Sequence, residues 1–278
     1  MNSSLIGVAI GLVFIATLAG ILSVPLLLRR QALSGDLVAH ALLPGLVGAF
    51  MITGIKETSI LLLGAVFTAW IALRLLSPLQ KHPRIKSDGA MAILISGAYA
   101  LGVFMLSLLQ KTENATQAGL DRYLLGSAAA LQWHEVLWAG GIFLLIVGGI
   151  LPNVSALQLW LFDPDQAKMR GINTHRLERG LEIGICLAVM MAVQFVGIVL
   201  AAALLIAPAL IARPWVNSLL GLWIGAAAIS AFAALTGTWI SFQSPGMPTG
   251  PWIVLSLAIF WVLSYAFWYS KRIIFQAK

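Results

Sequence analysis

Residues 5–30 read LIGVAIGLVFIATLAGILSVPLLLRR, and this run determines the class of fold. No charged residue lies between Leu5 and Leu28, and Arg29 and Arg30 follow directly. A helix of about 20 apolar residues crosses the hydrocarbon layer, because 1.5 Å of rise per residue then covers about 30 Å. A secretory signal would have a shorter apolar run, with basic residues ahead of it. The run therefore predicts a first membrane span.

The rest of the chain continues this pattern. Of its 278 residues 60% are hydrophobic and 10% are charged, whereas soluble domains average about 45–50% and about 25%. The apolar runs do not alternate as barrel strands do, so helices must satisfy their backbone polar groups. We expect an all-α, polytopic membrane helical bundle that forms a single transmembrane domain over residues 1–278. The eight further expected spans are residues 37–53, 59–77, 89–109, 134–151, 180–196, 198–212, 216–242 and 252–269.

Basic residues mark one side of the membrane. Cytoplasmic loops carry an excess of Lys and Arg, so these residues predict a cytoplasmic C-terminus, an N-terminus outside and an odd number of spans. We assign the net charge of +7 to these loops and to contact with membrane lipid, not to nucleic acid. The basic residues are Arg29, Arg30, Lys81, Arg84, Lys86, Lys168, Arg170, Arg176, Arg179, Arg213, Lys271, Arg272 and Lys278.

The stretch from Gly180 to Ala212 permits two interpretations. It is too long for one straight span and short for two, and Gln194, Gly197 and Pro208 interrupt it. Short hydrophobic segments broken by Gly or Pro are typical of discontinuous helices that line a transport pathway. The first interpretation is therefore two short helices, with these three residues lining the pathway and nine spans in all. The second is one long tilted helix with a proline kink, which leaves eight.

The segment SGDLVAHALLPG, residues 34–45, holds the leading candidate for a metal site. Asp36 and His40 are four residues apart, so on a helix they share one face. A carboxylate oxygen and an imidazole nitrogen suit a first-row divalent cation, and a two-fold dimer would supply four such ligands. The alternative is an aspartate favoured by the helix dipole and a histidine hydrogen-bonded in the core. The spacing alone does not choose between them.

A polar segment at about residues 160–178 predicts a short cytoplasmic helix. Asp163 can cap it with Pro164 at its first position, and Gly171 can end it. Such a helix is either a connector or a surface that docks into a soluble partner and relays movement. The residues for this second role are Phe162, Asp163, Pro164, Lys168, Arg170 and Gly171.

Other charged residues also fall in apolar segments, among them Arg74 and Glu182. We expect Arg74 to extend to the membrane interface and Glu182 to have a helix-terminal or interfacial role. No Walker A loop, dinucleotide fingerprint, nucleophile elbow or HExxH motif occurs in the sequence, so we expect no enzyme, and any ATP hydrolysis on a separate subunit.

Four stretches, in this order, resemble the permease subunits of bacterial ABC importers for zinc, manganese and iron. They are SGDLVAHALLPG (34–45), LFDPDQAKMRG (161–171), VQFVGIVLAAALLIAPALIAR (193–213) and MPTGPWIVL (247–255). The resemblance covers nearly the whole length. It implies an architecture related to that of vitamin B12 and siderophore permeases, whose short broken helices favour nine segments.

The resemblance also implies a mechanism and partners. Two copies would form a homodimer in the bacterial inner (plasma) membrane, with Asp36 and His40 holding the metal in its path. The segment Phe162–Gly171 would contact a cytoplasmic ATP-binding subunit, and an extracytoplasmic metal-binding protein would deliver the ion. The divalent metal is cargo, and no permanently bound cofactor is expected. A proton-coupled secondary metal transporter is the alternative, but it would need several intramembrane carboxylates, and only Asp36 is convincing.

Overall fold

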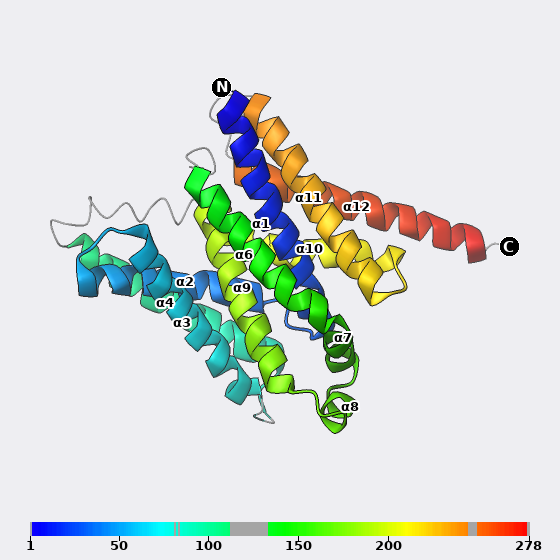
Figure 1. Cartoon of the computed structure of the whole chain (residues 1–278), viewed down its shortest axis with the longest axis horizontal. Helices are drawn as coiled ribbons and strands as arrows, with labels where there is room; N and C mark the ends of the chain where they lie inside the picture. Colours follow the sequence, from blue (N-terminus) through cyan, green and yellow to red (C-terminus); the bar gives the residue numbers. More distant parts are fainter. Residues whose placement is uncertain (1, 81, 83, 112–132, 244–248, 277–278) are drawn as a thin grey trace. The chain divides into compact units, whose positions relative to one another are not determined.

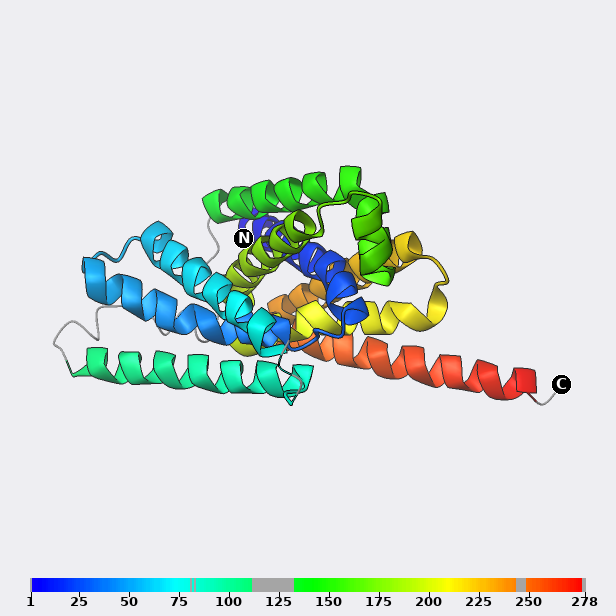
Figure 2. The same ribbon diagram turned by 90° about the horizontal axis from the view of Figure 1, so that it is seen from below.

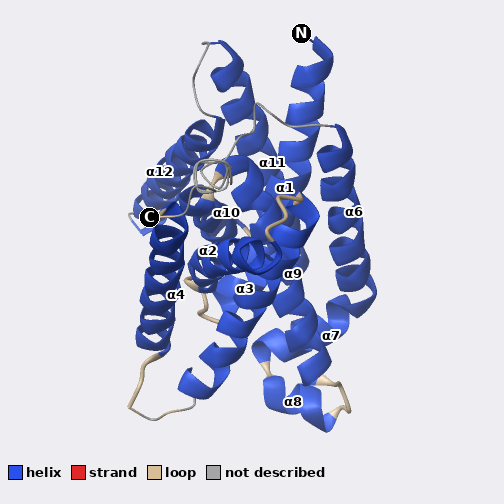
Figure 3. Cartoon of the chain, turned by 90° about the vertical axis from the view of Figure 1, so that its left-hand side faces the viewer, coloured by secondary structure: helices blue, strands red, loops and turns tan. Residues whose placement is uncertain are grey.

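The computed structural model describes residues 2–80, 82, 84–111, 133–243 and 249–276, and its regular structure there is helical throughout (Figures 1 and 3). Of the residues named above, Lys81, Met247, Pro248 and Lys278 lie outside this part. The helices are α1 (Asn2–Leu28), α2 (Ser34–Thr53), α3 (Thr58–Gln80), α4 (Ser87–Gln110), α6 (Trp133–Ile150), η3 (Leu151–Asn153), α7 (Val154–Phe162), α8 (Pro164–Met169), α9 (Thr174–Val196), α10 (Ile198–Ala212), η4 (Arg213–Trp215), α11 (Leu219–Gln243) and α12 (Thr249–Gln276).

Eight helices in the described part of the chain are long and apolar enough to cross a membrane, so the expected membrane helical bundle is confirmed. The ninth apolar helix, α10, has 15 residues and reaches about 22 Å, short of the roughly 30 Å of hydrocarbon. The eight long helices match the expected count of eight spans, and together with the short α10 they match the expected count of nine.

The helical conformation is interrupted at Gly197, between α9 and α10. Its φ of 92° and ψ of 165° lie in a region that L side chains rarely adopt, so a glycine is needed to end the helix there. The expected interruption is confirmed and the single long helix is wrong, but only α10 is short, because α9 begins at Thr174 and has 23 residues. Pro208 lies inside α10 and does not cause the break.

The helices form two compact units. One holds α1, α6, α7, α11 and α12, and the other holds α2, α3, α4 and α9; the short helices α8 and α10 are each divided between them. In the first unit α1 packs on α11, where a Cβ on Gly20 would lie 2.7 Å from the Ala226 carbonyl oxygen. The Trp215 indole N–H donates to Ser264 of α12 at 2.6 Å.

In the second unit α2 packs against both α3 and α4, and α4 runs alongside it (Figure 2). A Cβ on Gly64 of α3 would lie 2.7 Å from the Gly45 carbonyl oxygen, so the backbones of α2 and α3 nearly touch. Thr68 Oγ1 of α3 donates to the Ala41 carbonyl oxygen at 2.7 Å. Small residues allow this close approach in membrane helix pairs, and α2 and α3 are therefore closely packed.

Candidate functional site

The candidate metal ligands lie side by side on α2. Asp36 is in the first turn and His40 is one turn later, and Asp36 Oδ1 lies 3.4 Å from His40 Nε2. Their side chains are 30% and 22% exposed, whereas Leu37, Val38 and Ala39 between them are fully buried. Both side chains therefore face an accessible surface of α2. The core-histidine alternative does not describe His40, although Asp36 does occupy the first turn that a helix dipole favours.

A third side chain contacts this pair, and the sequence reasoning missed it. The ring of Tyr99 on α4 meets the ring of His40 edge to face, with 5.3 Å between centroids and 83° between planes. An aromatic contact of this kind restrains the rotation of the imidazole. Tyr99 is one of few polar side chains in its apolar run, which is the only signal in the sequence that pointed to it.

Contacts with neighbouring helices give the depth of the site within its unit. Ser34, at the start of α2, donates to Met91 Sδ at 3.7 Å, more than one turn inside α4. Tyr99, which contacts His40, and Thr68, which bonds Ala41, each lie about three turns from the ends of their helices. Asp36 and His40 are thus level with the middle of α3 and α4, because α2 begins inside the unit.

The geometry suits part of a coordination shell. With bonds of about 2.0–2.2 Å, adjacent ligands of a tetrahedral metal lie about 3.3–3.5 Å apart, and the 3.4 Å between Asp36 Oδ1 and His40 Nε2 matches. No group of three or more His, Cys, Asp or Glu side chains that could hold a metal occurs among the residues described. The pair therefore supplies two ligands, and a cation held firmly there needs further ones.

The short helix α8 has the capping that the sequence predicts. The backbone N–H of Gln166 donates to Asp163 Oδ1 at 2.9 Å, and α8 begins at Pro164. At the other end Gly171 has a φ of 75°. The N–H groups of Gly171 and Ile172 donate to the carbonyl oxygens of Lys168 at 2.9 Å and Ala167 at 3.0 Å, which is a Schellman motif.

Exposed apolar side chains lie at both ends of α8. Phe162 is 64% exposed and Met169 is 81% exposed, and Lys168 and Arg170 are exposed beside them. Such a surface is suited to contact with another protein. Just before it, the Arg29 guanidinium lies 4.3 Å from the ring centroid of the buried Trp160, which holds α7 against the end of α1.

The three expected pathway residues are all buried in this chain. Gln194 is 6% exposed, and Gly197 and Pro208 are also buried. Gln194 and Gly197 belong to the unit of α2, and Pro208 to the other. Their role in a pathway stays a prediction.

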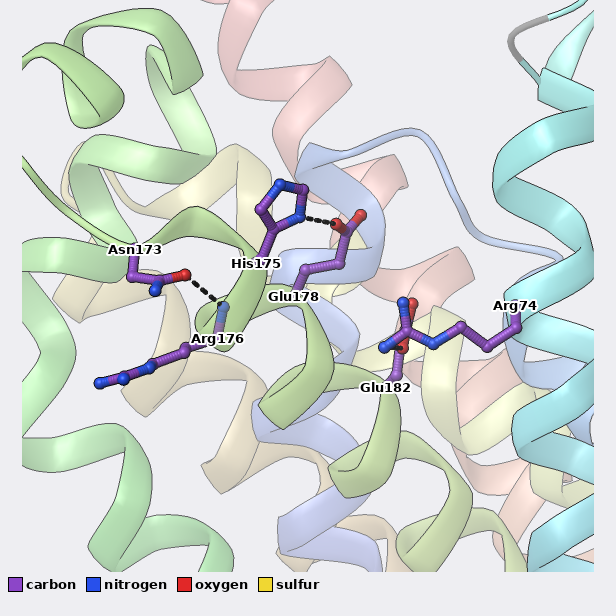
Figure 4. A network of polar contacts seen from close by, with 6 residues as sticks. All are labelled: Arg74, Asn173, His175, Arg176, Glu178 and Glu182. Atoms are coloured by element: carbon purple, nitrogen blue, oxygen red, sulfur yellow. Dashed lines mark hydrogen bonds and ion pairs between the residues drawn. The ribbon is translucent and has the colours of Figure 1, made fainter.

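Arg74 and Glu182 pair with each other, which the sequence reasoning did not foresee (Figure 4). Arg74 Nη2 on α3 lies 3.0 Å from Glu182 Oε2 on α9, and the Glu182 side chain is only 14% exposed. Neither residue simply occupies a helix end: Arg74 lies about two turns before the end of α3 and Glu182 about two turns after the start of α9.

Comparisons with known proteins agree with these features. A model of the ABC 3 transport family matches residues 1–268. The zinc transport system membrane protein TroC of Treponema pallidum is 35% identical over 269 residues, with 97% of this chain and 90% of TroC covered. The manganese transport system membrane protein MntC of Bacillus subtilis is 33% identical, covering 91% of this chain and 58% of MntC. The chelated iron transport system membrane protein YfeD of Yersinia pestis is also 33% identical, covering 91% and 82%.

Two solved structures have the same fold. The structure of PsaBC from Streptococcus pneumoniae in complex with Fab matches with a TM-score of 0.79 and 27% identity, covering 93% of this chain and 90% of that one. An inward-facing metal-chelate type ABC transporter matches with a TM-score of 0.69 and 19% identity, covering 93% and 86%. At that lower identity the second match supports the fold alone.

Proposed function

The chain belongs to the ABC 3 transport family and is a permease subunit of an ABC importer, and we propose that Asp36 and His40 hold its divalent transition-metal cargo during passage. The permease is not an enzyme, because ATP is hydrolysed on a separate subunit. One observation carries the assignment of the site: a carboxylate and an imidazole lie 3.4 Å apart, level with the middle of their neighbouring helices. Relatives named for zinc, manganese and iron transport support this class of cargo and do not single out one metal.

A homodimer would complete the coordination. Two copies related by a two-fold axis would bring two carboxylates and two imidazoles together, which is enough for tetrahedral coordination of zinc, manganese or ferrous iron. Ligands divided between two chains also explain how the ion leaves again, because a movement of one copy against the other opens the shell. The metal is cargo, and the proposal includes no resident cofactor.

The remaining partners follow from the same architecture. A cytoplasmic ATP-binding subunit would contact α8 through the surface from Phe162 to Gly171, and its closure on ATP would switch the side to which the pathway opens. An extracytoplasmic metal-binding protein would deliver the ion. The transport pathway would be lined, near the interruption between α9 and α10, by Gln194, Gly197 and Pro208.

The proposed orientation has the N-terminus outside and the C-terminus in the cytoplasm, in the bacterial inner membrane. The Arg74–Glu182 contact brings the end of α3 and the start of α9 to the same end of their unit. Arg84 and Lys86 follow α3, and Lys168 and Arg170 precede α9, so basic residues gather at that end. The positive-inside rule supports a cytoplasmic location for it.

Metal accumulation in cells that lack this gene tests the site. We expect the wild-type gene to restore accumulation, and Asp36→Ala or His40→Ala to reduce it at least about tenfold, because loss of one ligand leaves the shell incomplete. Asp88→Ala and His82→Ala are matched controls, since Asp88 is an exposed aspartate in the first turn of α4 and His82 is an exposed histidine in a loop. Full accumulation by both ligand variants, at equal membrane abundance, would remove the site assignment.

A further inference from the structure

An ion pair joins α3 to α9 inside the unit that carries the metal ligands. Arg74 Nη2 and Glu182 Oε2 are 3.0 Å apart, and the Arg74 guanidinium also lies 5.3 Å from the ring centroid of Trp70 (Figure 4). Arg74 is 34% exposed and Glu182 is 14% exposed. Charged side chains within membrane spans are costly, and they are typical of positions where a partner and a function maintain them.

The pair is connected to α8 by a short, well-held segment. Only Arg170–Asn173 separate α8 from α9, and both ends of this segment are capped. The Schellman motif at Gly171 ends α8, and the N–H of Arg176 donates to Asn173 Oδ1 at 3.1 Å at the start of α9 (Figure 4). Because the connection is short and hydrogen-bonded, a displacement of α8 reaches the first turns of α9, where Glu182 lies.

On the other side the pair is connected to the metal ligands. Arg74 is on α3, and α3 is held to α2 by the Thr68–Ala41 hydrogen bond of 2.7 Å and by the close backbone approach at Gly45. Ala41 directly follows His40 in the sequence. A shift of α3 therefore moves α2 with it, and the carboxylate and imidazole move as well.

We infer that Arg74 and Glu182 form a strut through which α9 displaces the α2–α3 pair when the ATP-binding subunit moves α8. Both are positioning residues, since neither contacts the metal ligands. Coupling between distant sites is carried by packed, rigid elements with two arrangements, and the strut is the ionic contact between two such elements. This inference rests on the proposed function, because it requires that α8 receives movement and that Asp36 and His40 bind the cargo.

The test measures metal transported per ATP hydrolysed by the whole importer in proteoliposomes. Arg74→Glu and Glu182→Arg each place like charges opposite one another, and the double variant restores the pair in reverse. Coupling between sites is typically worth about 5–150-fold, so we expect each single variant to lower the metal-to-ATP ratio at least about fivefold. The double variant should recover most of the loss, while the KM for ATP and the metal Kd of the permease remain those of the wild type.

Controls separate transmission from folding. Arg84→Gln removes an exposed arginine from the loop that follows α3 and should leave the ratio unchanged. If a charge reversal does not reach the membrane, Arg74→Lys and Glu182→Asp take its place, because they retain both charges and loosen the contact. A wild-type ratio in the variants that insert, or a lowered ratio that the double variant does not recover, overturns the strut. Absence of metal uptake by the wild-type importer itself would instead refute the proposed function.

Discussion

Replacing Gly64 by alanine tests the close α2–α3 contact that positions the helix carrying Asp36 and His40. A Cβ there would lie 2.6 Å from Ala49 Cβ and 2.7 Å from the Gly45 carbonyl oxygen. Neither atom can be moved by a side-chain rotation, so the two helices must separate. Overpacking of this kind costs about 1–3 kcal/mol. Alanine also favours the helix by up to about 1 kcal/mol over glycine, and a control must remove that contribution.

Gly97→Ala is the matched control, because Gly97 lies on α4 of the same unit and its new Cβ would meet nothing within 4 Å. The helix-propensity gain is then common to both variants, and their difference isolates the steric cost. A chain of this size loses about 2–4 °C of Tm per kcal/mol. We therefore expect Gly64→Ala to unfold about 2–12 °C below Gly97→Ala.

The chain provides its own reporter for this measurement. Cys186 is its only cysteine and is buried on α9, in the unit that holds Gly64. A dye that fluoresces on reaction with a thiol reports the unfolding of that unit during heating in detergent. Equal unfolding temperatures for Gly64→Ala and Gly97→Ala would refute the close contact and, with it, the argument that α3 and α2 move together.

Two further predictions concern the candidate site and the helix α8. Tyr99→Ala should weaken metal binding about tenfold in calorimetric titration of the permease, because it frees the His40 ring. Tyr99→Phe keeps the ring contact and should bind metal as the wild type does. Equal weakening by both variants would show that the hydroxyl matters and the ring contact does not. Asp163→Ala removes the cap of α8, which is worth about 1 kcal/mol, and should weaken binding of the ATP-binding subunit about fivefold in a surface-binding assay. Asp163→Asn should bind nearly as well as the wild type. Unchanged binding by Asp163→Ala would show that the cap has no role in this contact.

Local features of this protein were predictable from the sequence. The capping of α8 depends on Asp163 and Gly171, which act on backbone groups within a few residues of themselves. The break at Gly197 depends on one residue that tolerates a positive φ. The shared face of Asp36 and His40 follows from helical periodicity alone. Each of these features needs no knowledge of which helices are neighbours.

Other features required the tertiary structure. Residue counting starts every span at a membrane surface, and Asp36 lies in the first turn of its helix. The contacts of Ser34 with Met91 and of His40 with Tyr99 instead start α2 inside its unit. Arg74 was expected at the membrane interface and Glu182 at a helix end or an interface, and packing of α3 against α9 made them partners.

The length and charge of its apolar runs thus determined that this chain is a helical membrane protein, about where its long apolar helices lie along the sequence and which residues could bind a cation. The depth of Asp36 and His40, the ring that contacts His40 and the ion pair between α3 and α9 were decided only by tertiary packing. The physical reason is the register between helices. It depends on close contacts such as those of Gly45 with Gly64 and of Thr68 with Ala41, which join segments distant in the chain and leave no periodic pattern in either one.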